Sequence, residues 1–193
     1  LQAERPAAVF FDFAAAFPSL AHDFLQDVME HLQLPRHFQA FIANLYFGNG
    51  CKIAAAGDSH EGFSIRAGIR QGCPLSPLLF ALCRDLLLRR IQHLLPGDLC
   101  RAYADDIAVV IPQLEEAMPR LIELFGHFAR ISGLSLNLPK TVLVPLGGRR
   151  VEEVKTWISD AWPAWAGIQV EHKATYLGFC LGPEAGKAAW DKP

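Results

Sequence analysis

Hydrophobic positions along the chain fall into short runs and helical stripes that Gly, Pro and polar residues separate. Largely apolar runs predict strands at 7–13, 99–102 and 107–111, the last two joined as a hairpin. Shorter extended segments are predicted at 51–56, 62–65, 134–138 and 141–146, with two more strands within 168–181. The strand at 7–13 is apolar except for Asp12, so a carboxylate is expected inside a buried strand.

Apolar residues at helical spacing predict five helices. They are expected at 18–32, 38–47, 74–94, 113–131 and 151–162. Pro18 and Ser19 are expected to open the first, and Gly133 to end the fourth. Because strands and helices do not alternate strictly, the pattern favours an α+β fold with an antiparallel sheet packed on helices.

Composition indicates a globular chain with one sizeable core, since 51% of its 193 residues are hydrophobic and 20% charged. The formal net charge of −2 gives no general attraction to nucleic acid. Five cysteines without a CxxC pair argue against a zinc knuckle or a disulfide framework and indicate an intracellular protein. The longest apolar run, 75–83, contains two prolines, so no membrane segment is expected.

Two adjacent carboxylates, Asp105 and Asp106, stand between the strands of the predicted hairpin. Tight turns favour Asn-Gly or Asp-Gly, so Asp-Asp is a poor turn that holds two like charges together. A solvated acidic turn is the simpler reading of this pair. If strand 7–13 lies beside the hairpin, however, Asp12 joins them at one sheet edge. Three carboxylates there suit two Mg²⁺ ions about 3.5–4 Å apart, as used in phosphoryl transfer.

Five motifs in the chain together resemble a known family. They are FDFAAAF at 11–17, RQGCPLSPLLF at 70–80, YADD at 103–106, GLSLNLPKT at 133–141 and YLG at 176–178. Their order resembles that of the palm motifs of reverse transcriptases, specifically those of non-LTR (LINE-type) retrotransposons and their group II intron relatives. The pair RQGCPLSPLLF and YADD is specific, whereas YLG alone is weak.

The resemblance implies a polymerase palm with a ferredoxin-like or RRM-like antiparallel sheet, covering residues 1–182. A fingers-type hairpin insertion is expected at about 50–68, and residues 183–193 are expected to begin a truncated thumb or connection. Only six residues precede the first strand and only three follow Trp190, where the thumb should come, so the fingers and thumb of the same polyprotein are expected to be missing partners.

The resemblance also implies the site residues. Asp12, Asp105 and Asp106 would hold two Mg²⁺ ions, with Mn²⁺ as an alternative, and Lys140 would approach the leaving pyrophosphate. The backbone of Phe13 would lie near the nucleotide phosphates and Phe17 under the sugar, where it excludes a 2′-hydroxyl. The remaining implied contacts are those of Arg70, Gln71 and Gly72 with the nucleotide and template, of Tyr103 with the primer end, and of the primer grip formed by Tyr176, Leu177 and Gly178.

Most of these assignments have a plainer alternative. Phe17 and Tyr176 could be packing residues, Gln71 a helix cap and Lys140 a solvated loop charge. Arg89, Arg90, Arg149 and Arg150 are read as surface charges, and none of the seven histidines suggests zinc. Pro18 also departs from the family pattern, which often has an acidic residue after the aromatic.

The sequence therefore predicts an RNA-directed DNA polymerase that adds deoxynucleoside triphosphates to a DNA primer on an RNA template. The alternatives are a non-catalytic nucleic-acid-binding remnant of such a polymerase and an RNA-dependent RNA polymerase. The second fits less well, because that class normally has Gly-Asp-Asp at the hairpin and a polar residue at the position of Phe17.

Overall fold

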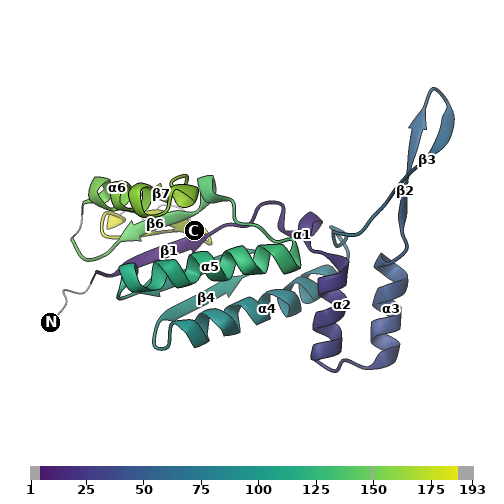
Figure 1. The fold of residues 1–193 in the computed structure, drawn as a ribbon, viewed down its shortest axis with the longest axis horizontal. Coiled ribbons are helices and arrows are strands. Elements are labelled where there is room, and N and C mark those ends of the chain that lie inside the picture. The colour runs from purple at the N-terminus through teal and green to yellow at the C-terminus, as the bar shows by residue number, and fades with distance from the viewer. Residues whose placement is uncertain (1–4, 149, 187–193) are drawn as a thin grey trace. The chain divides into compact units, whose positions relative to one another are not determined.

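The computed structural model describes residues 5–148 and 150–186 (Figure 1). The chain forms two compact units. The sheet unit comprises residues 1–14, 87–127 and 135–193, and the helical unit comprises residues 15–86 and 128–134. The part of the predicted thumb segment at 187–193 lies outside the described residues.

The sheet unit is built on five strands in the order β4-β5-β1-β6-β7. Their bounds are Leu99–Tyr103 (β4), Asp106–Ile111 (β5), Ala7–Phe11 (β1), Val142–Pro145 (β6) and Gln169–Val170 (β7). The pairs β4–β5, β5–β1 and β1–β6 are antiparallel, but β6 and β7 are parallel. The expectation of a wholly antiparallel sheet is therefore wrong at this edge. Helix α6 (Val151–Ala161) connects β6 to β7 and returns the chain in the same direction.

Different elements cover the two faces of the sheet, because successive side chains along β1 point to opposite faces. The ring of Phe11 lies 4.5 Å from that of Phe125 in α5 (Leu114–Ser132) and 6.4 Å from that of Trp165 in the 3-10 turn η2 (Pro163–Trp165). Phe10 faces the other way and packs against a cluster of Ala8, Val144 and Ala174. A hairpin of β8 (Ala174–Tyr176) and β9 (Phe179–Leu181) supplies part of that cover.

The helical unit contains α1 (Ala16–Ser19), α2 (His22–His31), α3 (Arg36–Tyr46) and the first part of α4 (Ser76–Leu94). Its core includes Leu25, Met29, Ile42 and Phe80, each no more than 1% exposed. Between α3 and α4, strands β2 (Gly50–Ala55) and β3 (Asp58–Ser64) form an exposed hairpin that extends away from the helices (Figure 1).

The first predicted helix, 18–32, is interrupted. Leu20 is extended (φ −61°, ψ 114°), and Ala21 rather than Ser19 precedes α2. The reason is a strand-like contact, because the Gly68 N–H donates to the Leu20 carbonyl at 2.8 Å and Ala21 bridges Ala67. Leu20 is fully buried at this break.

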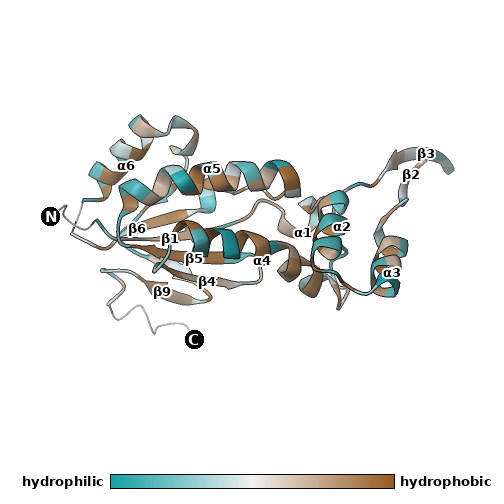
Figure 2. Ribbon diagram, turned by 60° about the horizontal axis from the view of Figure 1, so that its bottom comes forward, coloured by the Kyte–Doolittle hydropathy of each residue, from teal (hydrophilic) through white to brown (hydrophobic). Residues whose placement is uncertain are grey.

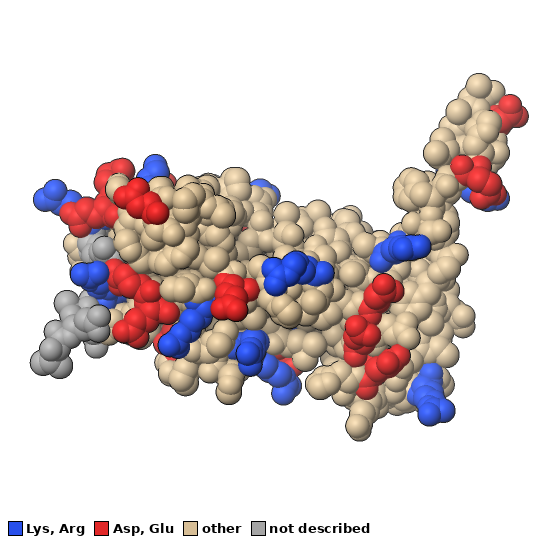
Figure 3. Space-filling view, in the orientation of Figure 1, with Lys and Arg blue, Asp and Glu red and all other residues tan. Residues whose placement is uncertain are grey.

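The other predicted helices and hairpins are confirmed to within a few residues, while 134–138 forms only one isolated bridge and 168–181 divides into three short strands. Brown bands in Figure 2 mark the apolar strands, and α5 has one hydrophobic stripe. Lys and Arg side chains are interspersed with Asp and Glu on the face drawn in Figure 3. Within the described part of the chain, no helix has the length and apolarity needed to cross a membrane.

Candidate functional site

The hairpin between β4 and β5 places its two aspartates differently from the sequence prediction. Tyr103 pairs with Asp106, so the two-residue turn consists of Ala104 and Asp105, and Asp106 is the first residue of β5. Ala104 accepts the left-handed conformation, with φ at 48°. That conformation costs an alanine about 1–2 kcal/mol. The turn therefore offsets the two carboxylates, with Asp105 in the loop and Asp106 in the strand.

Asp12 lies at the same end of the sheet as this hairpin. The antiparallel register of β1 and β5 runs from Ala7 opposite Ile111 to Phe11 opposite Ile107, and these last two residues are the chain neighbours of Asp12 and Asp106. Asp12 is not inside the strand as expected, because β1 ends at Phe11. Burial raises the pKa of the Asp106 carboxyl, and the negative charges of Asp105 and then Asp12 raise it further. The three predicted carboxylates thus share one electrostatic environment.

The backbone of Asp12 is held by the segment that carries Lys140. The Asn137 N–H donates to the Asp12 carbonyl at 2.8 Å. The hydroxyl of Thr141, which is fully buried, accepts from the Asp12 N–H at 3.4 Å and donates to the Asn137 carbonyl at 3.1 Å. Lys140 itself is exposed on the 3-10 turn η1 (Leu138–Lys140). Sequence reasoning selected Lys140 and missed Thr141, because only the folded backbone shows which groups this hydroxyl reaches.

The predicted metal centre is not preassembled. Across residues 5–148 and 150–186, no group of three or more His, Cys, Asp or Glu side chains is arranged to hold a metal ion. The end of the sheet nevertheless provides carboxylates that can act as metal ligands, namely Asp12, Asp105 and Asp106. Carboxylate oxygens are the ligands that Mg²⁺ prefers, and a divalent cation would relieve the repulsion that Asp106 experiences from its neighbours. The chemistry of these residues therefore fits the ion.

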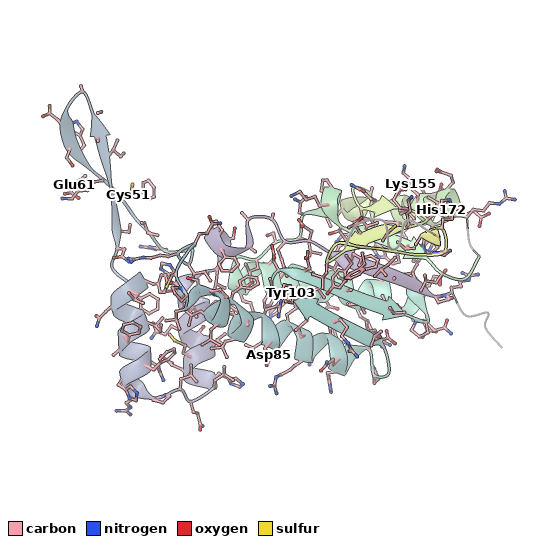
Figure 4. All side chains as sticks on the ribbon, turned by 180° about the vertical axis from the view of Figure 1, so that it is seen from behind. Cys51, Glu61, Asp85, Tyr103, Lys155 and His172 are labelled. Atoms are coloured by element: carbon pink, nitrogen blue, oxygen red, sulfur yellow. The ribbon has the colours of Figure 1, made fainter. Side chains whose placement is uncertain are left out.

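The other predicted residues of the sheet unit occupy several places. Tyr103 is 67% exposed at the end of β4 (Figure 4). Phe13 is 4% exposed, bridges Leu136 and packs 6.4 Å from Phe125, so its ring belongs to the core and only its backbone could meet a ligand. Tyr176 pairs with Phe179 around a turn of Leu177 and Gly178, and both turn residues have positive φ.

The Tyr176 ring is half-buried and lies 5.6 Å from that of Phe10, on the sheet face away from α5. The packing reading of Tyr176 therefore has a contact to support it, while the exposed Leu177 and Gly178 form the tip of the hairpin.

In the helical unit, Phe17, Gln71 and Gly72 border one pocket of about 340 Å³. Arg70 does not line it, since its Nη2 donates to the Leu45 carbonyl at 3.1 Å. Ser76 Oγ donates to the Arg70 carbonyl at 2.7 Å and lies 3.2 Å from the Tyr46 hydroxyl. The loop before α4 is thus fixed by buried polar groups that the sequence did not identify.

A protein-family model matches nearly the whole of this chain. The model describes the reverse transcriptase (RNA-dependent DNA polymerase) family and covers residues 2–181. Among curated proteins, the Pol polyprotein of the type-2 retrotransposable element R2DM from Drosophila melanogaster is 32% identical over 144 residues. The match covers 72% of this chain and 14% of the polyprotein.

Two further similar proteins come from elements of the same general kind. The Pol polyprotein of the type-1 element R2 from Popillia japonica is 27% identical over 76% of this chain and 26% of its own length. The transposon TX1 149 kDa protein from Xenopus laevis is 25% identical over 92% of this chain and 14% of its own length. The chain therefore spans a minor part of each of these relatives.

Solved structures with a similar fold include telomerase from Candida tropicalis. In its complex with a TWJ fragment of telomeric RNA, the match has a TM-score of 0.63 at 14% identity, over 93% of this chain and 29% of that one. The apo form gives a TM-score of 0.62 at 13% identity, over 92% and 31%. At this identity the likeness concerns the fold alone.

Proposed function

We propose that this chain, which belongs to the reverse transcriptase (RNA-dependent DNA polymerase) family and is a reverse transcriptase domain of the non-LTR retrotransposon type, extends a DNA primer on an RNA template. The observation that carries the proposal is the effect of the Asp105 and Asp12 charges on the Asp106 carboxyl, at the end of the sheet where Phe11 pairs with Ile107 and Tyr103 with Asp106. These positions are the ones that the motif resemblance assigns to the catalytic carboxylates.

In this proposal Asp12, Asp105 and Asp106 hold two Mg²⁺ ions, for which Mn²⁺ can substitute. When bound, such ions activate the primer 3′-hydroxyl and stabilise charge on the leaving oxygen. The protein's own contribution is to fix the donors before the reaction. Asp106 is fixed by the β4–β5 pairing, and Asp12 by the hydrogen bonds from Asn137 and to Thr141.

Lys140 is proposed to act on the pyrophosphate as it leaves, either by donating a proton or through its charge. Its place on η1 supports this role, because the hydroxyl and backbone of the next residue, Thr141, connect that turn to the segment of Asp12. Tyr103, exposed beside Asp106, is proposed to contact the primer end.

Nucleotide selection is assigned to the pocket of the helical unit. Phe17 would lie under the sugar, where its ring would collide with a 2′-hydroxyl. Gln71 and Gly72 would contact the nucleotide and the template base, while the backbone of Phe13 would lie near the phosphates. Arg70 is also kept as a nucleotide contact, although in this structure its guanidinium is bound to the Leu45 carbonyl.

The finer fold is proposed to be a polymerase palm over residues 1–182, with the β2–β3 hairpin at about 50–68 as a fingers-type insertion. The order β4-β5-β1-β6, with α4 and α5 in the two crossovers, supports a ferredoxin-like sheet. The hairpin at Tyr176, Leu177 and Gly178 would grip the primer backbone.

A primer-extension assay tests the proposal. Purified protein is given poly(rA) annealed to oligo(dT), with dTTP and Mg²⁺, and in parallel an RNA primer with ribonucleotides. We expect incorporation of dTMP on the RNA template and little extension with ribonucleotides. Preferential ribonucleotide addition would instead identify an RNA polymerase.

The second candidate function is binding of nucleic acid without catalysis. It requires only that the contacts with nucleic acid are kept while the three carboxylates hold no metal ions. A gel-shift measurement with the same primer–template distinguishes the two. Binding of the duplex with no incorporation at any Mg²⁺ or Mn²⁺ concentration would support this candidate over the polymerase.

A further inference from the structure

The ring of Phe17 stands at the edge of the pocket with little local support. It belongs to α1, a single turn of four residues that follows Ala15 in the left-handed conformation. The Phe17 carbonyl accepts a hydrogen bond from the Ile69 N–H at 2.9 Å, which fixes the backbone. This bond leaves the side chain free to rotate about χ1 and χ2. A side chain that discriminates by collision must be held in one orientation, because a mobile ring moves aside.

Phe80 supplies that restraint. Its ring is nearly parallel to that of Phe17, at an interplanar angle of 12° and a centroid distance of 5.1 Å. By contrast, the pair Phe11–Phe125 is tilted and the pair Phe24–Phe128 is edge-to-face. One face of the Phe17 ring is therefore covered, while Phe17 as a whole remains half-buried and lines the pocket.

Phe80 is itself fully buried. It is 1% exposed, and the adjacent Leu79 is fully buried. Along α4, Phe80 lies three and four residues after Pro77 and Ser76, which line the same pocket. Residues at this spacing share one helix face. Ser76 is further fixed by its hydrogen bond to the Arg70 carbonyl. The first turns of α4 thus hold both the loop at 70–73 and the ring of Phe17.

We propose that Phe80 is a positioning residue for sugar discrimination, because it stacks on Phe17 and keeps that ring where a 2′-hydroxyl would collide with it. The inference rests on the proposed function, in which Phe17 contacts the sugar of the incoming nucleotide. Phe80 itself is buried and does not touch the nucleotide. Substitution of Phe80 should therefore change the ratio of the deoxynucleotide affinity to the ribonucleotide affinity. General destabilisation would instead weaken both affinities alike and leave that ratio unchanged.

The test measures binding rather than turnover. The protein is bound to an RNA template with a dideoxy-terminated DNA primer and a G as the next template base, and dissociation constants are measured for dCTP and CTP. These ligands differ only in the 2′-hydroxyl. In Phe80→Leu and Phe80→Met, which keep an apolar side chain but lose the flat ring, we expect the preference for dCTP to fall about tenfold. Phe17→Ala should lose at least as much.

Phe24→Leu is the matched control. Phe24 is another buried aromatic of the helical unit, with its ring edge-to-face on Phe128 at 5.6 Å, and it lines none of the pocket described here. It should lower the melting temperature as the Phe80 variants do, yet keep the unmodified preference. Phe80→Met provides the answer if Phe80→Leu fails to fold.

The outcomes separate this inference from the function on which it rests. If Phe17→Ala abolishes the preference and both Phe80 variants retain it, Phe80 has no positioning role, while the role of Phe17 stands. If the unmodified protein binds dCTP and CTP equally, or binds neither, the proposed role of Phe17 fails and this inference fails with it. An equal loss of preference in Phe24→Leu would show a general packing effect and overturn the inference.

Discussion

The buried hydroxyl of Thr141 lies 3.4 Å from the backbone nitrogen of Asp12, across 129 residues of sequence. It accepts that N–H while donating to the Asn137 carbonyl, so a single side chain connects the turn of Lys140 to the strand end of Asp12. Thr141→Val keeps the shape but leaves the Asp12 N–H without this acceptor. We expect a loss of about 1–3 kcal/mol in the free energy of unfolding. Steady-state primer extension should show kcat reduced about tenfold with little change in KM for dTTP.

Thr141→Ser is the rescue variant, because it restores the hydroxyl. Its kcat should return to within about twofold of the unmodified value, although the lost methyl group costs some stability. A Thr141→Val protein with unchanged kcat would show that this hydrogen bond does not position Asp12 for catalysis.

Asp106 should limit the stability of the fold. Burial, then Asp105, then Asp12 raise the pKa of its carboxyl, so the folded protein binds this proton more tightly than the unfolded chain does. The ionised form therefore costs stability at neutral pH, and the cost disappears as the pH falls below the ordinary range of an aspartate. In metal-free buffer Asp106→Asn should melt at a higher temperature than the unmodified protein at pH 7, with the difference vanishing near about pH 3. The exposed Asp58→Asn is the control, and a lower melting temperature for Asp106→Asn at pH 7 would contradict the argument.

Cys73 should react faster with alkylating reagents than Cys83, whose pKa is also shifted. The backbone N–H of Leu75 lowers the pKa of the Cys73 thiol from its ordinary value of 9.0; desolvation opposes this effect, and smaller contributions from Ser76 and Tyr46 add to it. Burial raises the pKa of Cys83 to about 12. Because the thiolate is the nucleophile, the alkylation rate of Cys73 should reach half its maximum below pH 9. Mass spectrometry of the native protein checks this, with Cys83 left unmodified; comparable labelling of Cys83 would contradict it.

Sequence pattern was sufficient for much of the fold because the signals were local. Helix α4 and the hairpin β4–β5 were recognisable from apolar periodicity and from the residues that flank them. The predictions fail where contacts between segments distant in sequence determine the local structure. Leu20 is extended because it bonds to Gly68, and β7 is parallel to β6 because α6 returns the chain. Neither the hydrogen bond between Leu20 and Gly68 nor the pairing of β6 with β7 can be recognised from the residues adjacent in sequence.

The same distinction applies to the candidate site. The adjacency of Asp105 and Asp106 signalled an unusual turn, and motif resemblance added Asp12; the sheet register then brought the three together. The turn itself was misplaced by one residue, because the preference for Gly in such turns did not reveal that Ala104 would take a positive φ. Thr141, Ser76 and Phe80 were missed since their contribution depends on buried contacts between segments far apart in sequence.

The most direct measurement of the central claim is primer extension by Asp105→Asn on poly(rA)/oligo(dT). Asp105 lies in the turn between β4 and β5, outside both strands, so the substitution removes a charge without disturbing the sheet. We predict that dTMP incorporation falls by at least about a hundredfold, the order expected for a group that stabilises transition-state charge. The melting temperature should stay at or above that of the unmodified protein, and Asp58→Asn should remain fully active. Undiminished incorporation by a folded Asp105→Asn protein would contradict the assignment of this hairpin to catalysis.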